Sequence, residues 1–406
     1  MSQHKIMVIF GTRPEAIKMA PVIRRLETHR HELKTYVVVT GQHRSMLDQV
    51  LEIFQIEPDC DLDIMQPGQS LAEITVRALV GLESVMRCER PDMVLVQGDT
   101  TTAFTSGLAA FYQQIPIGHI EAGLRTRDKY NPYPEEINRR LLDVLTDLCF
   151  APTLRAREAL LTEGVLESRI LVTGNTVIDA LLTAVAEGHQ FTAPVLQQID
   201  FSAPHRTLLV TAHRRESLGT PLGEICLALY ELLTTREDLQ VVFPVHPNPK
   251  VRSTVLSILG GVERALLVTP LDYLDFVHLM TCVDLILTDS GGVQEEAPAL
   301  GKPVLVIRGT TERPEAIEAG TARLVGTARQ DIVAAVSQLL DDSTQYARMK
   351  HAINPYGDGH AAQRIVDSIR YFFGLLATRP LPFQADLRLS HLQPTRERRS
   401  QVTVYD

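Results

Sequence analysis

The chain has 406 residues, 45% hydrophobic and 22% charged, which suffices for two ordinary domains with separate cores. Its formal net charge of -9 argues against nucleic acid as a partner, because a polyanion requires a basic face. Five scattered cysteines without a CxxC pair indicate neither a disulfide framework nor a thiolate zinc site.

The chain enters an apolar strand almost at once, without a signal-peptide pattern, and no later run approaches ~18 apolar residues. We therefore expect a cytoplasmic protein with no membrane partner. Short apolar, β-branched runs alternate with helix-length segments, which predicts an α/β fold with two parallel sheets covered by helices. In chain order, the predicted strands are Lys5–Phe10, Tyr36–Thr40, Met93–Gln97, Ile115–His119, Thr207–Thr211, Gln240–Val245, Ala265–Val268, Asp284–Thr288 and Pro303–Ile307.

The weakest stretch between the two halves is about Thr173–Pro204, where a helix-like Val177–Ala186 gives way to a mixed segment. We place the domain boundary there. After Phe373 the helical periodicity ends and the chain becomes rich in Pro, Arg and Gln, which is typical of a flexible tail.

A phosphate site is indicated where a strand runs through Ser290-Gly291-Gly292 into a helix. Glycines allow close approach to phosphate oxygens, Ser290 adds a hydroxyl, and the helix start favours an anion. Glu296, about one turn later, is placed to accept hydrogen bonds from ribose hydroxyls. A tight strand-to-helix turn without a ligand explains the same glycines.

Cations follow two other predicted strands. Arg313 lies in the loop after the next strand, and Arg13 and Lys18 follow the first strand. Such loops line the ligand crevice of a parallel sheet. The loop after the first strand lacks GxGxxG, and a Walker A loop is absent, so these cations suit an anion better than a dinucleotide.

Ionisable side chains gather at further strand ends and loops: Asp99, Glu121, Glu135 and His213. Each also has a structural explanation: a helix cap at Asp99, pairing of Glu121 with Arg125, a favourable helix start at Glu135, and a satisfied histidine. The 13 histidines form no HExxH or other compact ligand spacing, and no GxSxG is present, so we expect neither a metal nor a cofactor.

Several long motifs resemble the non-hydrolysing UDP-N-acetylglucosamine 2-epimerases in order and spacing, over roughly residues 5–370. They are GTRPEAIKMAPV from Gly11, TGQHRSMLDQVL from Thr40, QGDTTTAF from Gln97, HIEAGLRT from His119, PYPEEINRR from Pro132, GNTVIDAL from Gly174, VTAHRRES from Val210 and TDSGGVQEEAPALGKPVL from Thr288.

The resemblance implies two Rossmann-like domains in a glycosyltransferase-B-like arrangement, a homodimer, and a UDP-N-acetylhexosamine substrate bound between the domains. We accordingly divide the chain into an N-terminal domain 1–173, a UDP-binding domain 174–365, a helix 366–376 crossing back, and a flexible tail 377–406. By motif match, the reactive residues are Asp99, Glu121, Glu135 and His213. The substrate-binding residues are Arg13, Lys18, Phe276, Ser290, Gly291, Gly292, Glu296 and Arg313. Leu271 stands where relatives have a glutamine.

The implied reaction is interconversion of UDP-N-acetylglucosamine and UDP-N-acetylmannosamine, through elimination of UDP to a 2-acetamidoglucal and re-addition. It requires a base, an acid and stabilisation of the leaving diphosphate. Alternatives are a 2,3-diacetamido-sugar 2-epimerase, a hydrolysing epimerase, a glycosyltransferase of the same architecture, and a non-catalytic UDP-sugar sensor.

The resemblance also implies a second UDP-sugar site that activates some relatives. Gln42, Gln69, Glu135, Arg214 and His246 match it, but Ser45 and Gly68 replace a glutamine and an arginine. Loss of a charged contact predicts weak or absent substrate activation.

Overall fold

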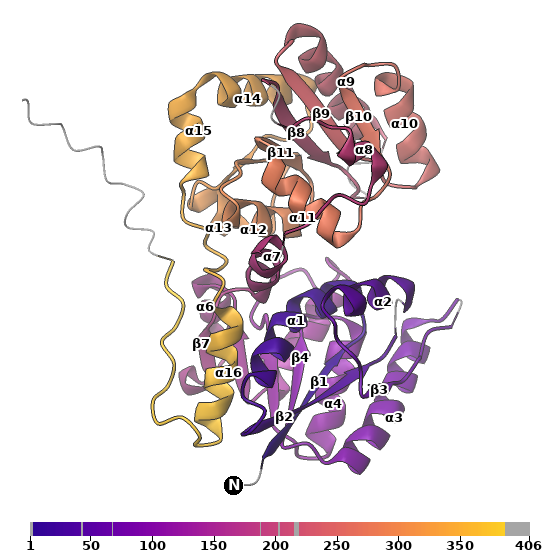
Figure 1. Ribbon diagram of the computed structural model, residues 1–406. Helices are drawn as coiled ribbons and strands as arrows, with labels where there is room; N and C mark the ends of the chain where they lie inside the picture. Colours follow the sequence, from indigo (N-terminus) through magenta and orange to yellow (C-terminus); the bar gives the residue numbers. More distant parts are fainter. Residues whose placement is uncertain are drawn as a thin grey trace, which may run out of the picture.

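The computed structural model describes residues 3–41, 44–66, 68–186, 188–201, 204–214 and 219–385. Two parallel sheets, one of seven strands and one of six, form the centres of two lobes, and helices cover both (Figure 1). The predicted α/β fold is therefore confirmed.

The N-terminal sheet has the strand order β3-β2-β1-β4-β5-β6-β7. Every residue of β4 is buried, because helices lie on both faces of the sheet, so the strand reads as a continuous apolar run. The strands are β1 His4–Phe10, β2 Leu33–Val39, β3 Cys60–Asp61, β4 Met93–Gln97, β5 Ile117–Ile120, β6 Leu148–Ala151 and β7 Ile170–Val172. The helices of this lobe are α1 Arg13–Glu27, α2 Arg44–Ile53, α3 Leu71–Glu89, α4 Thr101–Tyr112, α5 Glu135–Leu145, α6 Leu154–Thr162 and the 3-10 helix η1 Glu167–Arg169.

The C-terminal sheet has the strand order β10-β9-β8-β11-β12-β13. Its strands are β8 Arg206–Thr211, β9 Leu239–Pro244, β10 Ala265–Val268, β11 Leu285–Thr288, β12 Val304–Val306 and β13 Ala322–Leu324. Its helices are α9 Thr220–Thr235, α10 Pro249–Leu259, α11 Tyr273–Cys282, α12 Gly291–Ala299, α13 Pro314–Glu318, α14 Arg329–Asp341 and α15 Ser343–Lys350. The short α8, Pro194–Gln197, precedes β8.

All nine predicted strands are present, each with ends within three residues of the prediction. Four strands were not predicted: β3, β6, β7 and β13. Each has only two to four residues, which is too short for an apolar run to be distinguished from a helix segment.

Strand order reverses next to the first strand of each sheet, between β1 and β4 and between β8 and β11. At such a point the loops leaving neighbouring strands diverge to opposite faces and open a ligand crevice at the carboxyl ends. The topology therefore predicts two crevices, one per lobe.

The helix α7, Thr176–Ala186, joins the lobes. It packs on α1 of the N-terminal lobe and on α11 and α12 of the C-terminal lobe, and Figure 1 places it between the two. Phe54 and Tyr273 also meet across the junction, with ring centroids 5.8 Å apart. One apolar cluster consequently extends through both lobes and fixes their relative position.

The helix α16, Ala361–Phe372, packs on α1 and α7 (Figure 1). It begins five residues before the predicted helix 366–376. Its start is fixed by the Asp179 carboxylate, which accepts the backbone N–H groups of Ala361 and Ala362. Its end is held by an ion pair between Arg370 and Glu32 at 2.8 Å.

Part of the predicted tail 377–406 is packed against the N-terminal sheet. The Arg379 guanidinium donates to the Ile170 carbonyl at 2.6 Å, and the backbone N–H of the buried Phe383 donates to Val172 at 2.8 Å. The open edge of β7 supplies both acceptors, which explains why this stretch departs from the prediction. Residues 386–406 lie outside the described chain. Among the described helices, none is long and apolar enough to cross a membrane.

Candidate active site

A cavity of about 800 Å³ lies between the two lobes. Nearly all of its lining follows the carboxyl end of a strand: residues 12–18 after β1, 211–213 after β8, 244–246 at the end of β9, 270–276 after β10, and 290–296 after β11. Val177 of α7 adds an apolar wall. The crevices of the two sheets therefore face each other and form one site.

The start of α12 forms one end of the cavity. Gly291 and Gly292 are its first residues, and the Ser290 hydroxyl makes no capping hydrogen bond. A Cβ atom on Gly291 would lie 3.5 Å from the Arg214 guanidinium and 3.8 Å from that of Arg313, so both cations adjoin the helix start. Unpaired helix N–H groups beside two guanidinium groups suit a diphosphate.

Arg313 is held in place by Glu295. The Arg313 Nε donates to the Glu295 carboxylate, which also accepts from the Asn175 amide at 2.9 Å. Burial disfavours the charge on Arg313, but the nearby Glu295 and Glu121 carboxylates outweigh it and raise the pKa of Arg313. Arg313 is therefore a permanent cation at the cavity wall.

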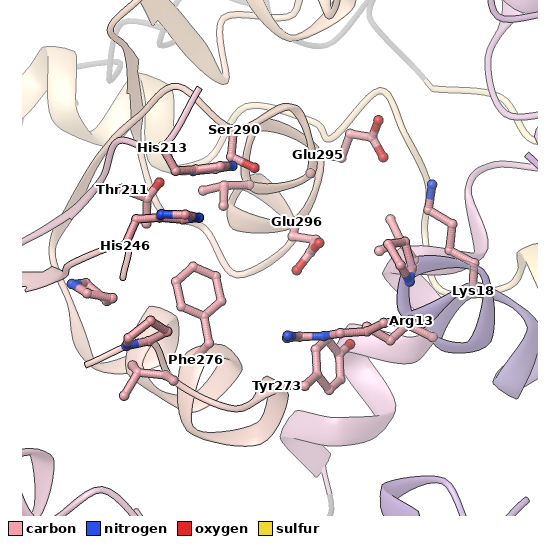
Figure 2. A pocket seen from close by; sticks show the side chains of 18 of the residues that line it. Arg13, Lys18, Thr211, His213, His246, Tyr273, Phe276, Ser290, Glu295 and Glu296 are labelled. Atoms are coloured by element: carbon pink, nitrogen blue, oxygen red, sulfur yellow. The ribbon is translucent and has the colours of Figure 1, made fainter. Parts of the chain in front are cut away.

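Glu296 projects into the middle of the cavity, between Phe276 and His246 on one side and Arg13 on the other (Figure 2). Burial, and then the neighbouring Glu295, raise the pKa of Glu296 to about 8. At neutral pH Glu296 is therefore largely protonated, and its carboxyl group can donate as well as accept a hydrogen bond.

Lys18 connects the cavity to Glu121. Its Nζ lies 2.5 Å from Glu121 Oε2, and Gln97 donates a further hydrogen bond to the same oxygen. Burial alone would raise the pKa of Glu121. The positive charges of Lys18 and then of Arg313 and Arg139 outweigh burial, and the pKa of Glu121 is lowered. Glu121 is thus an ionised carboxylate at neutral pH.

Asp99 follows β4 and is held by α5. The Arg139 guanidinium lies 2.8 Å from its carboxylate, and the Asn138 amide donates to its backbone carbonyl at 3.0 Å. Burial raises the pKa of Asp99, Arg139 opposes that shift, and Glu121 adds to it. The pKa of Asp99 is thus shifted toward its protonated form and that of Glu121 toward its ionised form, and opposite shifts of this kind suit an acid and base pair.

His213 lines the cavity after β8, with Nδ1 3.2 Å from the buried Asp289 carboxylate. Asp289 also accepts the backbone N–H groups of His213 and Arg214, so the loop and the imidazole are fixed together. Glu135 is the first residue of α5.

The predicted residues are distributed unevenly. Those lining the cavity are Arg13, Lys18, His213, Phe276, Ser290, Gly292, Glu296 and Arg313, with Gly291 directly beside it. Glu121 adjoins it through Lys18, and Asp99 lies within electrostatic reach of both. Glu135 does not line the cavity. Leu271, at the expected glutamine position, does.

Four further residues at the site, Glu295, Gln97, Tyr273 and Arg139, were not among those predicted from the sequence. Glu295 fixes Arg313, Gln97 binds Glu121, Tyr273 lines the cavity and Arg139 binds Asp99. The adjacent pair Glu295 and Glu296 was a usable signal, because neighbouring positions on a helix point about 100° apart and so serve different partners.

The residues matched to a second site are only partly described. Gln42 and the side chain of Ser45 lie outside the described chain. The Gln69 amide donates to the Ile64 carbonyl at 2.7 Å, while Arg214 pairs with Glu312 and His246 lines the cavity. Gly68 has a φ of 74°, a left-handed conformation that favours glycine over the arginine expected there from the resemblance.

One group in the described chain has the spacing of metal ligands: His189, Asp272 and Asp275. The Asp275 carboxylate already accepts hydrogen bonds from His189, from the Thr192 hydroxyl, and from the backbone of Thr192 and Ala193. None of the three metal-spaced residues lines the cavity. These hydrogen bonds fasten residues 189–193, which follow α7, to α11 and give the three residues a structural role.

A sequence model of the family described as UDP-N-acetylglucosamine 2-epimerase matches residues 24–370. The Escherichia coli K12 UDP-N-acetylglucosamine 2-epimerase is 54% identical over 370 residues, 90% of this chain and 98% of that protein. A Neisseria meningitidis UDP-GlcNAc 2-epimerase structure with bound UDP-GlcNAc is 48% identical with a TM-score of 0.81, covering 90% of this chain and all of that one. The Staphylococcus aureus MnaA structure with UDP is 48% identical with a TM-score of 0.85, covering 94% of this chain and 100% of that chain.

Proposed function

Because this chain belongs to the UDP-N-acetylglucosamine 2-epimerase family and is an epimerase of that sugar nucleotide, we propose how its cleft carries out the reaction. The observation that carries the proposal is the position of the cavity. An anion-binding helix start lies on one lobe, and an ionised and a protonatable carboxylate lie on the other.

UDP would bind to the C-terminal lobe. Its diphosphate would lie at the start of α12, with Ser290 and the backbone of Gly291 and Gly292 as donors and Arg313 as the counter-charge. Glu296 would accept from the ribose hydroxyls, and the uracil would lie near Phe276. This arrangement directs the sugar toward Arg13, Lys18 and the carboxylates of the N-terminal lobe.

The C2 proton has no adjacent carbonyl to acidify it, so elimination supplies the route. A base removes the C2 proton, a C1–C2 double bond forms, and the C1–oxygen bond breaks as UDP leaves with the electron pair. In the second half, a proton reaches C2 from the opposite face and a β-phosphate oxygen of UDP attacks C1. Inversion of C2 follows, with no net gain or loss of atoms or electrons.

The residues would divide these tasks by charge. The pKa of Glu121 is lowered, so this carboxylate suits the base, while burial raises the pKa of Asp99, which suits the acid. Arg13, Lys18 and Arg313 would stabilise the negative charge that develops on the leaving diphosphate. His213 is fixed by Asp289 at the cavity wall, where it can exchange a proton with the diphosphate.

The reaction is tested with purified protein and UDP-N-acetylglucosamine alone, followed by proton NMR. The expected result is a mixture of UDP-N-acetylglucosamine and UDP-N-acetylmannosamine without free sugar or an added acceptor. Free N-acetylmannosamine and UDP would indicate a hydrolysing epimerase. No change without an acceptor would favour a glycosyltransferase, and turnover confined to a 2,3-diacetamido substrate would identify that alternative.

The elimination route is tested in D2O. A proton taken up from solvent or from an exchanging group must appear as deuterium at C2 of the product. Product that keeps protium at C2 would refute elimination and re-addition.

A homodimer is the proposed assembly. Adjoining helices of the N-terminal lobe expose large apolar side chains, namely Val76 and Val80 on α3, Phe111 and Tyr112 on α4, and Leu141 and Val144 on α5. An exposed apolar surface of this kind favours association. Val80→Asp should shift the mass measured by light scattering toward a monomer, whereas Leu256→Asp, at an exposed site on α10, should not. A monomeric wild-type protein would exclude the dimer.

A cytoplasmic location stays a prediction.

A further inference from the structure

The helix α5 contacts Asp99 at two points. The Asn138 amide donates to the Asp99 backbone carbonyl at 3.0 Å, and Arg139 lies 2.8 Å from its carboxylate. Asn138 and Arg139 are adjacent and both buried, so the helix presents them inward together. The carboxylate and the backbone of Asp99 are therefore both fixed from the same helix.

Arg139 is an unusual residue for this position. It is only 8% exposed, and its Nε is buried without a hydrogen-bond partner in the described chain. An unpaired buried donor of this kind lowers the stability of the folded chain. Its neighbour Glu136, fully buried, lies 3.7 Å away but already accepts backbone N–H groups of Thr126 and Arg127. The closest carboxylate to the Arg139 guanidinium is therefore that of Asp99, at 2.8 Å against 3.7 Å for Glu136.

We propose that Arg139 is a positioning residue for Asp99: its guanidinium holds the carboxylate in place and orients it toward the sugar. This inference rests on the acid–base role given to Asp99 under the proposed function. No role in substrate contact is assigned to Arg139 itself.

The charged groups around Asp99 decide the sign of the effect. Arg139 approaches Asp99 from α5 and Lys18 from α1. His119 lies in β5 and Glu121 in the loop directly after it. Of the groups that oppose the burial of the Asp99 charge, Arg139 is the strongest. Its removal leaves burial and Glu121 to favour the protonated form, so the limb of the pH–kcat profile governed by Asp99 should move to higher pH.

The test compares Arg139→Met with Arg140→Met, both measured for kcat, KM, melting temperature and pH profile. Arg140 is the matched control, because it is the next residue on α5, is half-exposed, and pairs with Glu163 at 3.6 Å. Arg139→Met should lower kcat by about ten- to a hundredfold, as expected for loss of a close contact to a charged group, with little change in KM. Arg140→Met should match the wild type, and Arg139→Lys should restore the position of the pH limb.

A double variant separates positioning from general damage. In an Asp99→Asn background, Arg139→Met should cause little further loss of kcat, because Arg139 acts through Asp99. If Arg139→Met does not fold, as judged by circular dichroism, Arg139→Gln keeps an N–H donor without the charge and carries the same pH test.

The outcomes distinguish the inference from the function on which it rests. Near-normal turnover of Asp99→Asn would refute the acid–base site, and the inference with it. An impaired Asp99→Asn beside an Arg139→Met variant with unchanged kcat and pH profile would overturn the inference alone. Multiplicative losses in the double variant would also overturn it.

Discussion

Replacing Lys18 by methionine should destabilise the protein through the Glu121 carboxylate. The two groups are 2.5 Å apart, with side chains only 17% and 6% exposed. Removing one partner of a buried ion pair typically costs about 3–5 kcal/mol, because the other charge remains buried. Glu121 keeps the hydrogen bond from Gln97 and the attraction of Arg313 and Arg139, so we expect the lower end of that range, about 3 kcal/mol.

A double-mutant cycle measures this coupling. Lys18→Met, Glu121→Gln and the double variant are unfolded in urea and followed by far-UV circular dichroism, since the chain has no tryptophan. The double variant should be less destabilised than the sum of the single variants by about 2 kcal/mol.

An exposed pair supplies the control. Arg87 and Glu83 on α3 are also 2.5 Å apart, but their side chains are 73% and 43% exposed. The corresponding cycle should give a coupling of about 0.5 kcal/mol or less. A Lys18–Glu121 coupling no larger than this control would refute the reasoning from burial.

The pH dependence of the coupling follows from both pKa shifts. Glu121 has a lowered pKa, so its contribution is present above the ordinary value of 4.5 and is lost as the pH falls through the lower folded value. Lys18 has a raised pKa, because Glu121 and Glu295 outweigh its burial, so its contribution is present below 10.5 and is lost at higher pH. The coupling should therefore be nearly constant across the neutral range.

Three further predictions concern the cavity. The pKa of Glu296 is about 8 in the folded chain against an ordinary 4.5, so the melting temperature of the wild type without ligand should fall as the pH rises from 4.5 to 8. The melting temperature of Glu296→Gln should fall less over the same range, and equal profiles of the two proteins would contradict this. Asp99→Asn, Glu121→Gln and His213→Asn should each lower kcat far more than stability, and normal turnover in all three would remove the proposed site. Conversion of pure UDP-N-acetylmannosamine should start without a lag, whereas a long lag abolished by a trace of UDP-N-acetylglucosamine would show that the second site works.

The sequence was sufficient for the fold because buried parallel strands are apolar along their whole length, and because strand ends at a reversal of order carry the ligand loops. The partners of the charged residues were not readable in the same way. Lys18 and Glu121 are 103 positions apart, and only the packing of α1 beside the loop after β5 brings them together.

Two of the structural explanations predicted from sequence neighbours for the charged residues are wrong. The pairing of Glu121 with Arg125 is wrong, because Arg125 binds Asp143 and Glu163 instead. The cap of α4 is Thr100, one residue after Asp99. Sequence spacing alone cannot tell which of several nearby charged residues a side chain will pair with. The pairing depends on which donors from distant helices are brought beside it when the chain folds.

The backbone at Glu121 offers a separate test that the residue is kept for its carboxylate. Its φ is 70°, in the left-handed region where a non-glycine residue is strained by on the order of 1–3 kcal/mol. Its backbone N–H donates to Phe150 at 3.0 Å and thereby holds the conformation. Glycine would relieve the strain and alanine would not, so Glu121→Gly should be more stable than Glu121→Ala by about 1 kcal/mol, although both lack the proposed base and should be inactive. The comparison requires only two urea titrations and one activity assay. Equal or greater stability of the alanine variant would show that the backbone at position 121 is not strained. The left-handed conformation would then be no evidence that Glu121 is kept for its carboxylate at a cost in stability.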